Sequence, residues 1–211
     1  MQHLNELAAI GSKHHDRAEA YAIEVLINKS ATKDEYIQRS NLEEPDLKVI
    51  EWLETYVEEV WHSEVKLLHD RTATPFAGTA DLVVRLKDGS IALCDYKFRK
   101  WGGTILKPQP RGCITLKDAL QMACYEDLVY KEMNVRVDNW VSIMVDREGK
   151  GAYGYSWKDG SGMATSIPGF SWPTSKRRLF SAITMDQIRE SWRSALQLWY
   201  FQNHAFKKEV A

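Results

Sequence analysis

The sequence has few of the features that mark secreted, membrane-bound or zinc-stapled proteins. Cysteine occurs only three times in 211 residues. An odd number without a Cys-x-x-Cys pair predicts neither a disulfide framework nor a zinc site. No apolar run approaches the roughly 20 residues that span a bilayer, and the first residues lack the basic-then-apolar layout of a signal peptide. These absences predict a cytoplasmic protein without a membrane partner.

An excess of charge of either sign is also missing. The chain has 28 Lys and Arg against 29 Asp and Glu, a formal net charge of −1. Proteins that bind nucleic acid by charge alone are usually basic, so this balance argues against a passive nucleic-acid binder. It does not exclude an enzyme that acts on nucleic acid, because a bound metal ion changes the local charge of a carboxylate site.

Hydrophobic periodicity predicts one α/β domain. Helices are expected where apolar residues recur every three or four positions, namely at 4–28, 45–60, 115–133 and 184–203. Strands are expected at short apolar segments, namely 63–68, 78–86, 91–98, 137–145 and 152–157. Loops are expected at 32–43, 99–113 and 158–182. This order predicts a mixed central sheet flanked by helices. The single domain, 1–211, then has a helical N-terminal part (1–60), a core (61–157) and a C-terminal loop and helix (158–211).

The most informative stretch is GTADLVVRLKDGSIALCDYKFRK, residues 78–100. Its central Asp-Gly pair supports the positive φ angle of a tight turn and predicts a hairpin. Asp81 lies near the start of the first strand, and Asp95 and Lys97 lie near the end of the second, so the hairpin brings them together. Residues two apart on a strand share a face, so Asp95 and Lys97 point one way and Tyr96 the other.

Two carboxylates at close range repel each other unless a cation lies between them. Mg²⁺ or Mn²⁺ suits such oxygen ligands and leaves coordination positions for water and phosphate. Lys97 could hold the attacking water or stabilise charge that develops on the phosphate. The set of Asp81, Asp95 and Lys97 is therefore suited to phosphodiester hydrolysis. On these three residues alone, a solvated strand face is an equally good interpretation.

Three further features are each unremarkable by themselves. In the helix expected at 115–133, Gln121 and Tyr125 are four residues apart and share a face. In the first helix, Gly11 and His15 are also four apart. Glu64 precedes the central hairpin.

Together, these residues resemble the RecB-like branch of the PD-(D/E)XK nucleases, which includes CRISPR-associated, mitochondrial and phage exonucleases. The ordered features of that family match this chain over about residues 11–130, as Gly11…His15, Glu64, Gly78…Asp81, Asp95-Tyr96-Lys97 and Gln121…Tyr125. The resemblance implies a restriction-endonuclease-like core with a mixed sheet.

The resemblance also implies roles for these residues. His15, Asp81 and Asp95 would bind Mg²⁺ or Mn²⁺, with the backbone carbonyl of Tyr96, and Lys97 would act in catalysis. Gln121 and Tyr125 would steady the lysine or contact DNA phosphate. Glu64 would be a second-metal or supporting residue. His14 competes with His15, but the Gly-xxx-His spacing selects His15, and His14 aligns with the apolar stripe of the first helix.

Two features that accompany some relatives are missing. Three cysteines cannot supply the four that hold an iron–sulfur cluster, so none is expected. No Gly-xxxx-Gly-Lys-[Ser/Thr] motif is present, so no helicase is built in. Both absences favour a stand-alone nuclease of the phage type.

Two basic stretches are candidates for DNA contact. The first lies in the loop after the Asp-x-Lys strand and contains Arg99, Lys100, Lys107 and Arg111. The second follows Phe170 and Trp172 and contains Lys176, Arg177 and Arg178. Basic residues beside aromatic ones suit backbone contact and base stacking on single strands. A solvated loop with buried aromatic residues explains the second stretch equally well.

The resulting expectation is a Mg²⁺- or Mn²⁺-dependent deoxyribonuclease that acts on DNA ends, and the resemblance implies that it leaves 5′-phosphates. Recombination or replication proteins are possible partners. One alternative is a structure-specific endonuclease or junction resolvase with the same site. Another is a non-catalytic DNA-binding module of the same fold, against which the intact Asp/Asp/Lys set argues.

Overall fold

The computed structural model describes residues 2–70, 75–103, 108–109, 115–159, 162–164 and 183–202. Its helical segments are α1 (Gln2–Tyr21), continued by the π-helical segment η1 (Ala22–Ile27), α2 (Lys33–Arg39), α3 (Glu44–Tyr56), α4 (Leu116–Met133) and α5 (Met185–Tyr200). Its strands are β1 (Val57–His69), β2 (Phe76–Leu86), β3 (Ile91–Arg99), β4 (Gly102–Gly103), β5 (Pro108–Gln109), β6 (Asn139–Asp146), β7 (Ala152–Ser156) and β8 (Gly162–Ala164). None of the described helices combines the length and the apolar character needed to cross a membrane.

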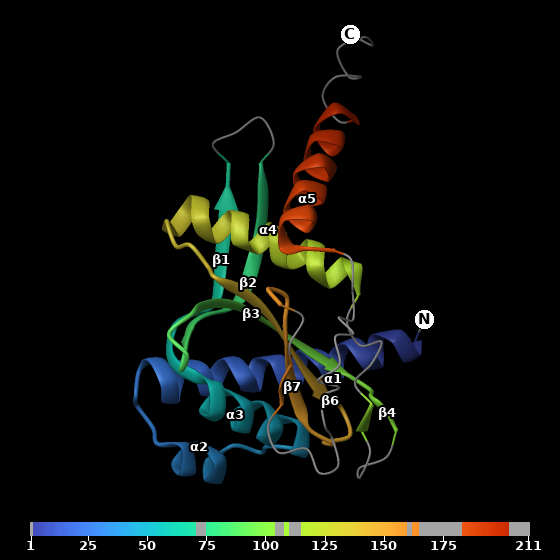
Figure 1. Cartoon of the computed structure of the whole chain (residues 1–211). Coiled ribbons are helices and arrows are strands. Elements are labelled where there is room, and N and C mark those ends of the chain that lie inside the picture. The colour runs from blue at the N-terminus through green and yellow to red at the C-terminus, as the bar shows by residue number, and fades with distance from the viewer. Residues whose placement is uncertain are drawn as a thin grey trace.

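The main sheet is mixed, which confirms the predicted α/β architecture. Its six strands follow the order β1-β2-β3-β6-β7-β8. β3 and β6 run parallel, and every other neighbouring pair is antiparallel. The parallel pair requires a crossover, and α4 lies within the connection from β3 to β6. Two layers of helices enclose the sheet, with α1, α2 and α3 on one side and α4 and α5 on the other (Figure 1).

Each face of the sheet contributes to a separate hydrophobic core. The α1/α3 core contains Tyr21, Trp52 and Leu53 of the helices with Cys94, Tyr96 and Phe98 of β3. The α4/α5 core contains Met122, Leu128 and Ile188 with Leu93, Trp140 and Met144 of the sheet. Because side chains alternate along a strand, the odd-numbered residues of β3 face α4. Asp95 and Lys97 are therefore directed toward α4.

The predicted hairpin at residues 87–90 is confirmed. β2 and β3 pair in register from Arg85↔Ile91 to Leu82↔Cys94. Gly89 has a φ of 85°, which glycine adopts without steric cost. Asp88 accepts a hydrogen bond from the backbone N–H of Ser90 through Oδ1, at 2.9 Å. The turn chemistry alone therefore determined this part of the fold.

Several predicted element boundaries were wrong. The second helix ends at Tyr56, and Val57 and Val60, which fall within the helix expected at 45–60, lie in β1 instead. A valine every three residues fits a helix by spacing, but β-branched side chains favour strands, and pairing with β2 decides the outcome. The stretch 32–43, expected to be a loop, contains α2, which begins with a capping box between Thr32 and Glu35. Short strands β4, β5 and β8 lie in the other two expected loops.

Candidate metal centre

The candidate site lies where β2 and β3 separate. Their pairing ends at Leu82↔Cys94, and beyond this point the backbone N–H of Tyr96 donates to Oδ2 of Asp81 at 2.8 Å. A carboxylate thus takes the place of a strand-to-strand hydrogen bond. Asp81 is 6% exposed and Asp95 is 1% exposed. The hairpin therefore brings both acids to its open end, as the sequence predicted, and the structure shows that both are buried there.

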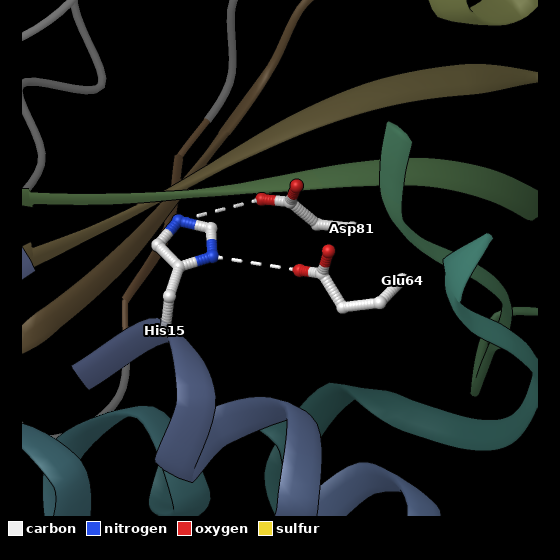
Figure 2. A group of neighbouring side chains, drawn as sticks. All are labelled: His15, Glu64 and Asp81. Carbon is white, nitrogen blue, oxygen red and sulfur yellow. Dashed lines mark ion pairs between the residues drawn. The ribbon is translucent and has the colours of Figure 1, made fainter. Parts of the chain in front are cut away.

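His15 reaches this open end from α1. Its Nε2 lies 3.2 Å from the carbonyl oxygen of Tyr96 and 3.6 Å from Oδ2 of Asp81. Its Nδ1 lies 3.6 Å from Oε1 of Glu64. Figure 2 shows one ring nitrogen of His15 directed at the Asp81 carboxylate and the other at the Glu64 carboxylate. His15, Glu64 and Asp81 each offer a ligand atom, and these atoms lie within 4.8 Å of one another, close enough for one metal ion.

Glu64 reaches the site through an unusual backbone conformation. It lies between the paired residues Ser63↔Leu82 and Val65↔Ala80, so it is opposite Asp81. Its φ is 49°, in the left-handed region that non-glycine residues rarely adopt. Such strain is concentrated at functional sites, where the surrounding structure enforces it.

The three residues of the cluster line a cavity of about 330 Å³. The cavity is lined by Ser12, His15, Asp16, Glu19, Glu64, Thr79, Asp81 and Tyr125. Asp16 and Glu19 lie on the same side of α1 as His15 and add negative charge. Neither acid was assigned a role from the sequence, although the spacing of four from His15 to Glu19 was a usable signal. The cavity therefore has the charge and polarity that favour a cation.

The titrating groups show the cost of burying these charges together. Burial alone would lower the pKa of His15, but Glu64, Asp81 and the Tyr96 carbonyl outweigh it and raise that pKa to about 9. Burial and the negative charge of Asp95 raise the pKa of Asp81 to about 7, despite His15 and the Tyr96 N–H. Burial also raises the pKa of Asp95, although Lys97 opposes this shift. A divalent cation would relieve this repulsion.

These pKa shifts predict how the metal-free protein responds to pH. His15 contributes stability that is present below its unfolded pKa of 6.5 and is lost as pH rises through about 9. The pKa of Asp81 rises from 3.8 in the unfolded state to about 7 in the folded state, so folded Asp81 binds more protons between these pH values. The contribution of Asp81 to stability therefore also falls as pH rises. We therefore expect the melting temperature in EDTA to fall from about pH 6 to about pH 9. The double variant Asp81→Asn/His15→Gln should show a flatter profile. Equal slopes for both proteins would contradict this interpretation.

The strained backbone at Glu64 predicts that a glycine variant is more stable than an alanine variant, the reverse of the usual order. In an ordinary strand, a protein with glycine is less stable than one with alanine by roughly 0.5–1 kcal/mol. At a left-handed φ the order reverses, because alanine suffers a steric cost of about 1–2 kcal/mol that glycine avoids. Glu64→Gly should therefore be more stable than Glu64→Ala in denaturant unfolding without metal. Both variants should bind Mn²⁺ more weakly than the wild type. If alanine is the more stable, the backbone at Glu64 is not strained.

Asp95 and Lys97 form a second group against α4. Nζ of Lys97 lies 2.5 Å from Oδ2 of Asp95 and donates to Oε1 of Gln121 at 3.2 Å. The Gln121 amide donates to Oδ1 of Asp95 at 3.2 Å and to the hydroxyl of Tyr125 at 2.8 Å. Gln121 and Tyr125 are uninformative as a sequence motif by themselves. In the structure Gln121 bonds both Asp95 and Lys97, and Tyr125 bonds Gln121.

Gly78 provides the space for Tyr125. A Cβ atom at this position would lie 2.7 Å from Cε1 of the Tyr125 ring. A larger residue would therefore displace the ring and, through its hydroxyl, the Gln121 amide. This close approach is a physical reason for glycine three residues before Asp81.

His14 and His15 occupy different environments. His14 is 1% exposed, with Nδ1 2.6 Å from Oδ1 of Asp46, and its ring stacks on Phe98. His15 faces the carboxylates of Asp81 and Glu64. The structure therefore places His15 at the cluster and packs His14 between α3 and β3.

Two of the basic residues expected to contact DNA lie in the described part of the chain, and both form ion pairs. Arg99 binds both carboxylate oxygens of Asp118, at 2.6 and 2.9 Å, and so fastens β3 to the start of α4. Lys100 is exposed but pairs with Glu148 at 2.6 Å. The remaining candidates lie outside the described residues, namely Lys107, Arg111, Lys176, Arg177 and Arg178.

No family model and no curated protein matches this sequence.

Proposed function

We propose that this protein is a Mg²⁺- or Mn²⁺-dependent deoxyribonuclease of the RecB-like PD-(D/E)XK type. The observation that carries the proposal is the meeting of side chains from α1, β1 and β2 at the point where β2 and β3 separate. There, His15, Glu64 and Asp81 lie next to the strand that carries Asp95 and Lys97. The spacing of these residues in the sequence and their grouping in space support the same chemistry.

The donor set fits a hard divalent cation. Carboxylate and carbonyl oxygens favour Mg²⁺ and Mn²⁺, and one imidazole among them is a further suitable ligand. His15, Asp81, Asp95 and the carbonyl of Tyr96 would hold the ion, with Glu64 nearby. When bound, the ion would polarise the scissile phosphate and lower the pKa of a water molecule.

The protein's own groups would complete the reaction. The Lys97 ammonium is positioned by Gln121 and Asp95, so it can bind a phosphate oxygen without reorganisation as negative charge develops. Tyr125 lines the cavity and, together with Gln121, can orient the lysine. Burial of these groups lowers the local dielectric constant and strengthens each interaction.

A panel of DNA substrates tests this proposal. Purified protein is incubated with linear, end-blocked and covalently closed circular DNA in Mg²⁺, in Mn²⁺ and in EDTA. We expect digestion of free-ended DNA with either metal and none in EDTA. Cleavage of closed circles would instead support the endonuclease alternative. A protein that binds DNA but cleaves no substrate with metal would be the non-catalytic module, and the proposal would be wrong.

A further inference from the structure

Asp46, in the first turn of α3, is a buried carboxylate that the proposed chemistry does not use. It is 1% exposed. Its Oδ1 lies 2.6 Å from Nδ1 of His14, and its Oδ2 accepts from Nη1 of Arg17 at 2.7 Å. Oδ2 also accepts from the backbone N–H of Glu43 at 2.7 Å, which completes the cap of α3. Two of its three partners thus belong to α1, the helix that carries His15.

His14 is held on two sides. The Nδ1 atom of its ring forms a hydrogen bond with Asp46. The face of the ring stacks on the ring of Phe98 in β3, with ring centroids 5.1 Å apart. The next residue, His15, meets the ring of Tyr96 edge-on at 5.4 Å. Adjacent residues of a helix point about 100° apart. Any rotation of α1 that moves His14 must therefore also move His15 relative to β3.

α1 makes other directional contacts as well: the hydroxyl of Tyr21 donates to Oε1 of Glu54, and the hydroxyl of Tyr36 donates to the carbonyl oxygen of Arg17 at 2.9 Å. Neither of these bonds involves His14, the residue next to His15. Asp46 supplies directional bonds to two residues of α1, one turn apart. A buried ionic cluster is a weak source of stability, because apolar groups of similar volume often serve as well. The particular contribution of this cluster is the geometry it imposes.

We infer that Asp46 is a positioning residue for the candidate metal centre: through His14 and Arg17 it fixes the rotation and height of α1 and thereby places His15. The consequence for metal binding rests on the proposed function, whereas the placement of His15 does not. Groups that hydrogen-bond a metal ligand directly typically change metal affinity by about 10–100-fold when they are lost. Asp46 acts on His15 only through His14 and Arg17, so we expect an effect near the lower end of that range.

The test compares two buried carboxylates. Asp46→Asn keeps the side-chain volume but turns an amide group toward His14 or Arg17. The matched control is Asp146→Asn, because Asp146 is 0% exposed and accepts from the backbone N–H groups of Trp101, Glu148 and Lys150, far from α1 in sequence. Each variant is examined for melting temperature, for Mn²⁺ affinity by calorimetry, and for the nuclear Overhauser effect between the rings of His15 and Tyr96 without metal.

Asp46→Asn should weaken Mn²⁺ binding about tenfold or more and remove the His15–Tyr96 Overhauser effect. Asp146→Asn should lower the melting temperature but change Mn²⁺ affinity by less than about twofold. If Asp46→Asn does not fold, Arg17→Gln removes one of the two bonds to α1, and it should act in the same direction with a smaller effect.

Two results would overturn the inference. One is that the Overhauser effect and the Mn²⁺ affinity are both unchanged in the Asp46 variant. If the Arg17 variant replaces it, the same result in the Arg17 variant overturns the inference. The other is that both the Asp46 and the Asp146 variant lose Mn²⁺ affinity in proportion to their loss of melting temperature. If the wild type binds no Mn²⁺, the proposed function fails, and the Overhauser comparison still decides whether Asp46 positions His15.

Discussion

Replacing Asp95 with asparagine should abolish metal-dependent DNA cleavage while the protein stays folded. Asparagine keeps the volume of the buried side chain and an oxygen that can accept from Lys97, so the packing against α4 should persist. It removes the negative charge on which metal binding depends. Loss of a metal ion's contribution to the transition state, about 4 kcal/mol or more, corresponds to a rate reduction of about 10³-fold.

Cleavage of linear DNA in Mg²⁺ measures this effect, and circular dichroism with thermal melting in EDTA measures the fold. The matched control is Asp127→Asn on α4. Asp127 also pairs with a lysine, Lys131, at 2.9 Å, but it does not line the cavity of the candidate site. The control should cleave at the wild-type rate. A folded Asp95→Asn protein that cleaves DNA at a similar rate would show that the site has been assigned wrongly.

Removing the Lys97 ammonium should lower kcat far more than it raises KM. The ammonium acts chiefly on charge that appears in the transition state, and the loss of one such donor costs on the order of 10²–10³ in rate. Lys97→Ala tests the loss of the side chain, and Lys97→Met tests the loss of charge with most of the stem retained. Both should show the same large fall in kcat.

The metal concentration must be varied in this experiment, because Lys97 also pairs with Asp95. Removing the lysine also removes a positive charge beside a proposed metal ligand and can change metal affinity, so saturation with Mn²⁺ separates a metal effect from a catalytic one. Lys131→Met is the matched control, since Lys131 forms a comparable pair with Asp127 on the outer part of α4. A rise in KM with unchanged kcat would make Lys97 a phosphate anchor and not a catalytic group.

Both experiments concern residues whose proximity could be predicted from the sequence alone. Asp81 and Asp95 belong to strands joined by a short Asp-Gly turn, and strand alternation puts Lys97 on the same face as Asp95. The pairing Leu82↔Cys94 confirms this geometry. The selection of His15 over His14 followed from the Gly-xxx-His pattern of the family that the chain resembles and from the alignment of His14 with the apolar stripe, and the structure places His15 beside Asp81. Such inferences depend on neighbours within a few residues or across one tight turn.

The sequence did not reveal where the second helix gives way to β1, or how Glu64 enters the site. Val57 and Val60 fit a helical stripe as well as they fit a strand, and only the long pairing with β2 selects the strand. Glu64 has its left-handed conformation within that same ladder, opposite Asp81. No local propensity predicts a strained backbone, because the surrounding contacts enforce it.

The partners of charged residues were the least predictable feature. The sequence did not predict the ion pair of Arg99 with Asp118 or the bonds of Asp46 to His14 and Arg17. The sequence by itself determined the periodic elements, the hairpin and the acids at its open end, because these follow from local backbone geometry. Only the tertiary structure decided which charges meet, because an ion pair forms wherever the packed elements bring two long side chains within reach, whatever their separation along the chain.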